Sequence, residues 1–176
     1  MKRMLSIFTC CCLIMMGFSA YAETVVVDFD DLEGFGPIPA GYAGFENWGS
    51  WAHSTSADET YFPRSGETFA LSVGAPAPIV FGQPFAFSGA WFTGYANHGV
   101  LFELYVGGEL VHTSEILMIE QGFHQWLGSG YDGAVDEVLV VNAVGANFWC
   151  MDDLTYEDGT VATTATSLSS VKRLFD

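Results

Sequence analysis

The stretch NFWCMDDLTYED (147–158) decides the fold, because its apolar and aromatic residues have the composition of a buried β-strand. Two adjacent carboxylates, Asp152 and Asp153, stand in its middle, although aspartate is depleted in strands. Successive strand residues point to opposite faces, so a regular strand cannot direct both carboxylates to the same side. The stretch DFDDLEG (28–34) repeats the Asp-Asp-Leu core near the other end of the chain. The doublets therefore need an explanation of their own.

A β-hairpin is predicted near the middle of the chain. The run VLFELYV (100–106) alternates apolar residues on one face, and ELVHTSEILMI (109–119) follows it. Gly107 and Gly108 separate the two runs, and a Gly-Gly pair between such runs is typical of a two-residue hairpin turn.

Short apolar runs separated by glycine and proline continue along the chain. Pro84 is expected to separate the strand APIVFG (77–82) from the strand FAFSGAWFTGY (85–95), because proline cannot donate a ladder hydrogen bond. Helical periodicity is scarce. About nine or ten short strands with dense turn signals predict an all-β fold, an antiparallel jelly-roll β-sandwich.

The N-terminus has the pattern of a secretory signal peptide. Lys2 and Arg3 precede an apolar run, and Ala20-Tyr21-Ala22 fits a cleavage site. A transmembrane anchor is the alternative, but the run is shorter than the roughly 20 residues that a span needs. We expect residues 1–22 to be removed, residues 23–157 to form one domain, and the Thr/Ser-rich residues 158–176 to form a flexible tail. The protein is then secreted, without a membrane anchor after cleavage.

The charge balance excludes several classes of partner. The chain has five Lys and Arg residues against 21 Asp and Glu, and cleavage would leave three basic residues and a net charge near −18. Nucleic acid and anionic membrane surfaces both require a cationic face, so neither is an expected partner. Divalent cations are compatible with such a chain.

Catalytic motifs are not found in the sequence, and we expect no enzymatic activity. The four histidines show no zinc-ligand spacing, and no nucleophile elbow is present. After cleavage, Cys150 is the remaining cysteine, so no internal disulfide can form. Its neighbours Trp149 and Met151 indicate a small buried hydrophobic residue. A glycosidase needs two carboxylates at a set separation, a criterion with little specificity among 21 acids.

The two acidic doublets are candidate ligands for a structural calcium ion. In a jelly roll the first and last strands commonly lie side by side, which would bring Asp30 and Asp31 near Asp152 and Asp153. Neighbouring carboxylates repel one another, and Ca²⁺, which takes six to eight oxygen ligands, would reverse that repulsion. The alternative is that one residue of each doublet faces solvent while the other ends a strand or caps a turn.

Aromatic residues are the candidates for binding a ligand. Aromatic faces stack on the apolar faces of sugar rings, so exposed aromatic residues on a β-sandwich indicate glycan binding. Trp48, Trp51 and Tyr61 lie near loops, and we expect them to be exposed. Trp91 and Trp149 are expected in the core.

Several stretches, in this order, resemble the secreted bacterial β-sandwich proteins that often carry a PEP-CTERM sorting tail. The resemblance rests on FDDL (29–32), IPAGYAGFENW (38–48), PFAFSGAWFTGYANHGVLFELYVGGELVHTS (84–114), DEVLV (136–140) and FWCMDDLTYE (148–157). It implies a jelly roll similar to galactose-binding and carbohydrate-binding modules, in which the end strands often frame a calcium ion. No Pro-Glu-Pro motif and no terminal arginine cluster follow Tyr156, so this chain departs from the sorting pattern.

Three functions remain after this reading of the sequence. The first is a secreted, non-catalytic module that binds extracellular polysaccharide. The second is an acidic structural or matrix protein of the cell exterior without specific glycan binding. The third is a polysaccharide-cleaving enzyme. An aromatic-lined surface favours the first, burial of all tryptophans favours the second, and a cleft with a perturbed carboxylate pair favours the third.

Overall fold

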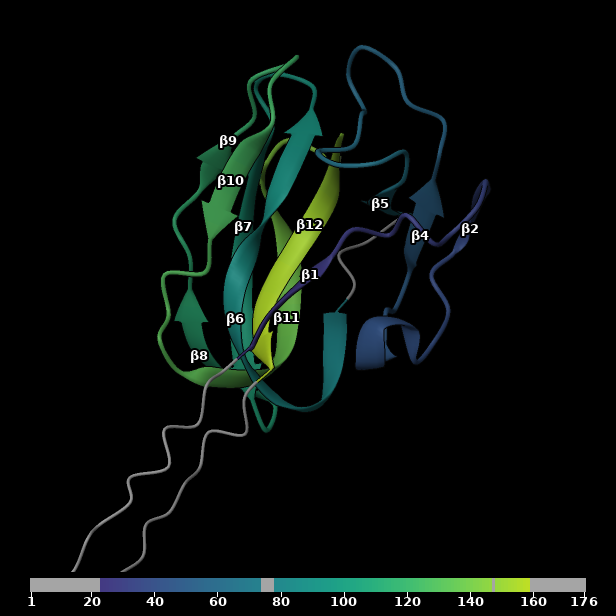
Figure 1. The fold of residues 1–176 in the computed structure, drawn as a ribbon. Coiled ribbons are helices and arrows are strands. Elements are labelled where there is room, and N and C mark those ends of the chain that lie inside the picture. Colours follow the sequence, from purple (N-terminus) through teal and green to yellow (C-terminus); the bar gives the residue numbers. More distant parts are fainter. Residues whose placement is uncertain (1–22, 74–77, 147, 159–176) are drawn as a thin grey trace, which may run out of the picture. The chain divides into compact units, whose positions relative to one another are not determined.

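The computed structural model describes residues 23–73, 78–146 and 148–158 (Figure 1). The predicted signal peptide and residues 159–176 of the predicted tail lie outside them. The described residues form twelve strands, all pairs antiparallel, and one 3-10 turn, η1 (Tyr42–Gly44), so the predicted all-β antiparallel sandwich is confirmed with more strands than expected. The strands are β1 (Glu23–Val27), β2 (Phe35–Pro37), β3 (Phe45–Asn47), β4 (Trp51–Ser54), β5 (Phe69–Ser72), β6 (Pro78–Gly94), β7 (Gly99–Val106), β8 (Glu109–Thr113), β9 (Leu117–Met118), β10 (Gln125–Gly128), β11 (Ala134–Val144) and β12 (Trp149–Asp158).

The long strand β6 belongs to both layers of the sandwich. Its C-terminal half pairs with β12 and β10, and this front layer continues from β12 through β5 and β4 to β2, with β1 also on β12. Its N-terminal half pairs with β3 and β11, and this back layer continues through β7 to β8 and β9. The inner faces of the two layers enclose the core.

The prediction that Pro84 separates two strands is wrong. Residues 78–94 form one strand, and Pro84 lies in its exposed bend at residues 82–84. The pairing with β11 passes from Val135↔Phe85 to Glu137↔Val80, so the register shift leaves the bend outside the ladder. Proline is tolerated there because no partner requires its missing N–H group.

The first and last strands lie side by side, as predicted. β1 pairs with β12 from Glu23↔Asp158 to Val27↔Leu154 (Figure 1). Asp158, expected to begin the tail, is the last residue of β12.

The predicted hairpin is confirmed. β7 and β8 are joined by Gly107 and Gly108, which follow Val106 and precede its partner Glu109. Both glycines have positive φ, 58° and 81°, as a turn matching the twist of the strands requires.

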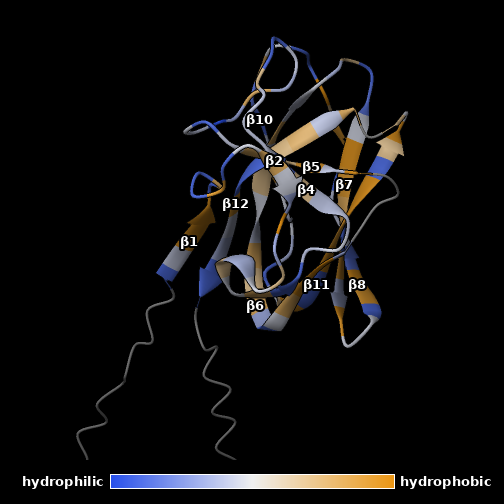
Figure 2. Ribbon diagram, turned by 90° about the vertical axis from the view of Figure 1, so that its right-hand side faces the viewer, coloured by the Kyte–Doolittle hydropathy of each residue, from blue (hydrophilic) through white to orange (hydrophobic). Residues whose placement is uncertain are grey.

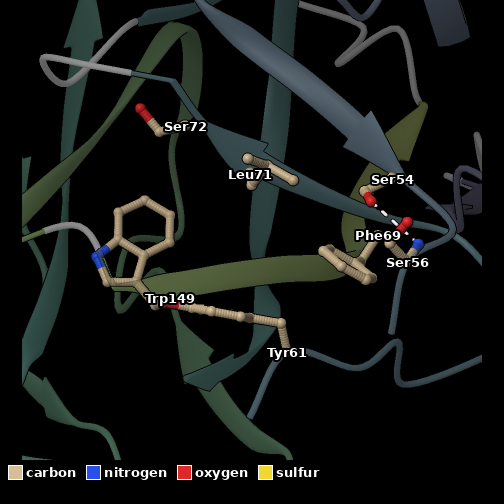
Figure 3. Close-up of a pocket in the computed structure, with 7 residues that line it drawn as sticks. All are labelled: Ser54, Ser56, Tyr61, Phe69, Leu71, Ser72 and Trp149. Carbon is tan, nitrogen blue, oxygen red and sulfur yellow. Dashed lines mark hydrogen bonds between the residues drawn. The ribbon is translucent and has the colours of Figure 1, made fainter. Parts of the chain in front are cut away.

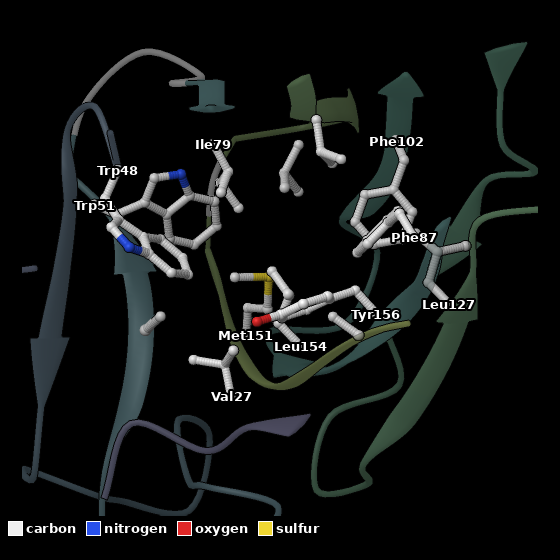
Figure 4. Packing of buried hydrophobic residues seen from close by; sticks show 14 of the residues in the cluster. Val27, Trp48, Trp51, Ile79, Phe87, Phe102, Leu127, Met151, Leu154 and Tyr156 are labelled. Carbon is white, nitrogen blue, oxygen red and sulfur yellow. The ribbon is translucent and has the colours of Figure 1, made fainter. Parts of the chain in front are cut away.

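The core is rich in aromatic side chains from both layers. Phe92 and Phe87 of the front layer contact Phe102 of the back layer, with ring centroids 5.8 and 4.9 Å apart. Trp48 and Trp51 point into this interior (Figure 4) and are each 1 % exposed. Hydrophobic residues are concentrated along β6, β7 and β11, and hydrophilic ones in the connecting loops (Figure 2). None of the helical structure in the described residues is long and apolar enough to cross a membrane.

Candidate functional site

A long irregular segment, residues 55–68, crosses the outer face of the front layer between β4 and β5, and we call it the strap. Thr93 of β6 donates a hydrogen bond from Oγ1 to the carbonyl oxygen of Phe62 at 3.1 Å. His124 donates from Nε2 to the carbonyl oxygen of Pro63 at 2.7 Å. The strap is thereby fixed to both β6 and the segment before β10.

One acidic doublet holds the middle of the strap. Oδ2 of Asp152 accepts the backbone N–H groups of Arg64 at 2.7 Å and Ser65 at 3.0 Å. Oδ1 of Asp153 accepts the hydroxyl of Ser65 at 2.7 Å. Asp153 has a φ of 46°, within a bulge where the β12–β6 register shifts. The bulge interrupts the alternation of a regular strand, so both carboxylates reach the same segment.

The other doublet holds the end of the strap. Oδ1 of Asp30 accepts the backbone N–H groups of Glu67 at 2.8 Å and Thr68 at 3.0 Å. Oδ1 of Asp31 instead accepts the hydroxyl of Tyr42 at 2.5 Å. The repeated Asp-Asp-Leu therefore supplies one carboxylate clasp from each end of the domain, and strap N–H groups are the donors.

These contacts do not favour a shared calcium ion. Oxygens of Asp30 and Asp152 face N–H donors, whereas Ca²⁺ requires surrounding oxygen ligands. Within residues 23–73, 78–146 and 148–158, no three or more His, Cys, Asp or Glu side chains gather as a metal-binding group. Calcium binding by Asp30, Asp31, Asp152 and Asp153 stays a prediction from the sequence.

Burial dominates the electrostatics of Asp152. The side chain is 3 % exposed, and loss of hydration raises its pKa to about 7. The N–H groups of Ser65, Asp153 and Arg64 act in the opposite direction, and they compensate only part of the desolvation. Asp152 therefore titrates near neutral pH in the folded protein.

Cys150 is buried, as its apolar neighbours predicted, and it lies beneath the strap. It is 1 % exposed, and its Sγ lies 2.9 Å from Oγ1 of Thr93. Burial raises the pKa of the thiol to about 12. The reactive thiolate is therefore scarce and shielded in the native state.

We expect Cys150 to react with a thiol reagent only when the strap or the whole domain opens. Native labelling at pH 8 should be at least about 100-fold slower than labelling in denaturant, because opening free energies limit access to a buried group. The measurement is mass-spectrometric labelling against time. Native labelling at the rate of a small free thiol would contradict the buried position.

An exposed tryptophan lies on the outer face of the front layer. A Cβ at Gly89 would lie 2.7 Å from Cζ2 of Trp126, and one at Gly128 would lie 3.4 Å from its Nε1. Gly89 and Gly128 are register partners. The indole of Trp126 therefore lies over two neighbouring backbone segments that carry no side chain, and it remains 39 % exposed.

A second tryptophan and an arginine extend this surface. Trp91, the register partner of Trp126, is half-buried, and the two ring centroids lie 5.7 Å apart. The guanidinium carbon of Arg64 lies 4.8 Å from the ring centroid of Trp91, a cation–π arrangement. We call Trp126, Trp91 and Arg64 the platform.

A polar pocket of about 320 Å³ adjoins the platform. Ser88 and Ser129 line it. Ser88 precedes Gly89 and Ser129 follows Gly128, the two glycines beneath Trp126. The backbone N–H of Ser129 donates to the carbonyl oxygen of Ser88 at 2.8 Å, which keeps the two segments together. The full lining is Ala86, Phe87, Ser88, Ser129, Gly130, Tyr131, Asp132 and Glu157.

The predicted ligand-binding residues are placed differently from expectation. Exposure of Trp48 and Trp51 is wrong, because both side chains are in the core and cannot stack on a ligand. The Nε1 of Trp48 donates to the carbonyl oxygen of Tyr42 at 3.1 Å, so its burial leaves that polar group satisfied. Tyr61 is half-buried in the strap and lines a pocket of about 290 Å³ (Figure 3).

Sequence reasoning missed the platform. Trp91 was expected in the core, but its side chain is half-buried on the outer face. The available indication was Trp126, which alternates with Leu127 in β10 and must face away from the core when Leu127 faces into it.

Comparisons with known proteins give only distant similarities. No family model matches the chain, and no curated protein matches it. A mutant of the family 29 carbohydrate-binding module CBM29-2, solved with mannohexaose, is 13 % identical with a TM-score of 0.47, covering 79 % of this chain and 94 % of that chain. Another CBM29-2 mutant, solved with cellulohexaose, is 12 % identical with a TM-score of 0.45, covering 78 % of this chain and 92 % of that chain. Similarities this low do not show a shared function.

Proposed function

We propose that this chain is a secreted, non-catalytic module that binds extracellular polysaccharide on the platform. The observation that carries the proposal is the indole of Trp126, which lies over Gly89 and Gly128 and remains 39 % exposed. A flat, exposed aromatic face matches the apolar C–H face of a sugar ring. The adjoining pocket, with the partly exposed Ser88 and the exposed Asp132 and Glu157, offers hydrogen-bonding groups to sugar hydroxyls.

The charge of the surface narrows the class of polysaccharide. Among the described residues, Arg64 is the single Lys or Arg, beside 20 Asp and Glu residues. Such a field repels polyanions. The ligand is therefore a polymer without carboxylate or sulfate groups.

Replacing Trp126 with alanine is expected to weaken polysaccharide binding roughly 30-fold or more, because truncation of a central aromatic contact typically costs about 2 kcal/mol. Binding is measured by affinity electrophoresis in gels containing glucomannan, xylan, mixed-linkage β-glucan or alginate. We expect retention by at least one neutral polymer and none by alginate.

Tyr105→Ala is the matched control for that test. Tyr105 is a half-buried aromatic residue on β7 of the back layer, far in the strand order from β10. Its replacement should leave retention unchanged. Equal losses in Tyr105→Ala and Trp126→Ala, or no retention of the wild type by any neutral polymer, would contradict the proposal.

The acidic surface also supports a second candidate, a structural protein of the cell exterior. The observation in its favour is that the described part of the chain has 20 acidic residues beside a single Lys or Arg, Arg64. That function requires neither an exposed Trp126 nor a neutral polymer. Retention that depends on Trp126 separates the two candidates.

A further inference from the structure

A second pocket lies on the front layer, across the strap from the platform. It has a volume of about 290 Å³ and is formed where β5 and β12 diverge, since these strands share the single register pair Met151↔Ala70. Figure 3 shows Tyr61 from the strap opposite Leu71 from β5. We call this the strap pocket, lined by Ser54, Ser56, Tyr61, Phe69, Leu71, Ser72 and Trp149.

The lining of the strap pocket combines rings with hydroxyl groups. The partly exposed Tyr61 and Leu71 supply apolar surface, and the exposed Ser56 supplies a hydroxyl, while Ser54, Phe69, Ser72 and Trp149 are buried members of the lining. A sugar unit presents the same combination, apolar C–H faces bordered by hydroxyls. The volume lies at the lower limit of drug-sized sites, roughly 300 to 1,000 Å³, so the pocket suits one small ring rather than a larger ligand.

The strap pocket and the platform are on one continuous face. The strand order across that face is β4, β5, β12, β6, β10. The pocket lies over β4 and β5, and the platform lies over β6 and β10. Four strand spacings of about 4.8 Å separate the outermost strands, which places β4 and β10 roughly 19 Å apart measured across the strands.

The strap itself connects the two sites. Tyr61 forms a wall of the strap pocket, and Arg64, three positions later, covers Trp91 of the platform. Tyr95 is 44 % exposed and contacts Tyr61, with ring centroids 5.6 Å apart. Aromatic surface therefore continues from Tyr61 to Tyr95, the residue that follows the end of β6.

We propose that the strap pocket holds a second sugar unit of the same polysaccharide chain that lies on the platform. This inference rests on the proposed function and specifies its ligand as an extended linear chain, not a monosaccharide or a short chain end. Once a chain is bound at one site, its binding to the second site is intramolecular. The high effective concentration of the tethered sugar unit then raises the overall affinity.

The expected result is a strong dependence of affinity on chain length. With cello- and manno-oligosaccharides of two to eight units, titration calorimetry should show an affinity gain of at least about tenfold once the chain spans both sites. Glucomannan serves as the polymer in affinity electrophoresis. Tyr61→Ala, which removes a wall of the strap pocket, should remove this length-dependent gain and weaken polymer retention by a similar factor.

A second variant distinguishes loss of the strap pocket from a disturbance of the strap itself. Leu71→Trp fills the strap pocket from β5 without altering the strap, and it should give the same loss as Tyr61→Ala, whereas Tyr105→Ala should give none. If the wild type retains glucomannan and both pocket variants match it, the inference is overturned and the proposed function stands. If the wild type binds no oligosaccharide and no neutral polymer, both the inference and the proposed function are contradicted.

Discussion

Replacing Gly89 with alanine is expected to lower the free energy of unfolding by roughly 2–5 kcal/mol, from about 1–2 for a strained backbone and about 1–3 for overpacking. Gly89 has a φ of 146°, a conformation that favours glycine, and an added Cβ would lie 2.2 Å from the carbonyl oxygen of Leu127. That oxygen belongs to the backbone of β10 and cannot move without opening the ladder to β6.

The measurement is thermal unfolding followed by circular dichroism, with an expected decrease in Tm of about 10 °C. Gly82→Ala is the matched control, because Gly82 lies in the same strand and an added Cβ there has nothing within 4 Å. It should leave the Tm nearly unchanged. A Gly89→Ala protein that melts with the wild type would show that the close approach at this site is absent.

Gly89→Ala should also weaken binding to the platform. The same Cβ would lie 2.7 Å from the Trp126 ring, so the indole must tilt away from the sheet. Stability and binding should therefore fall together in Gly89→Ala, whereas Trp126→Ala should reduce binding with a smaller effect on Tm.

The contribution of Asp152 to stability is expected to decrease as the pH rises from about 4 to about 7. Its pKa is raised from 3.8 to about 7 by burial, so the folded state binds a proton more tightly than the unfolded state. The stabilisation is complete below the unfolded pKa and is lost as the pH passes the folded pKa. Three pKa units correspond to about 4 kcal/mol.

Urea unfolding of the wild type and Asp152→Asn from pH 4 to 8 measures this contribution, because subtracting the two profiles removes the other acidic residues. The wild type should lose stability relative to Asp152→Asn as the pH rises. Asp58→Asn is the control: N–H groups of Tyr61 and Thr60 lower the pKa of Asp58 from 3.8, so its contribution changes in more acidic solution and its difference profile should be flat from pH 4 to 8. Parallel profiles for the wild type and Asp152→Asn would contradict the raised pKa.

Local sequence patterns were sufficient to predict much of the fold. The Gly107-Gly108 turn was predictable because a two-residue hairpin turn of this type needs positive φ at both positions, which glycine adopts without steric cost. Burial of Cys150 followed from its apolar neighbours. Pro84 was misread because a bend between two layers leaves the same sequence pattern as the end of a strand, and the layers become apparent only from long-range pairing.

The candidate site depended on contacts that a sequence does not display. Trp48 is near loops along the chain, but burial is decided by what packs around it, and η1 supplies the acceptor for its indole N–H. Exposure of Trp126 depends on Gly89, 37 positions earlier, becoming the partner of Gly128. Neither glycine has a local pattern that identifies its partner.

The two carboxylate clasps set the order in which this surface is assembled. Asp152 and its donor Arg64 are 88 positions apart, whereas Asp30 and Thr68 are 38 apart. Contacts that close longer loops form later, and a chain synthesised from its N-terminus presents Asp152 last. Both tryptophans of the platform are thus made before the carboxylate that secures Arg64 beside them. Newly made chains would complete the platform only when β12 docks, so synthesis interrupted before Asp152 yields a product that carries both tryptophans without the clasp that holds Arg64.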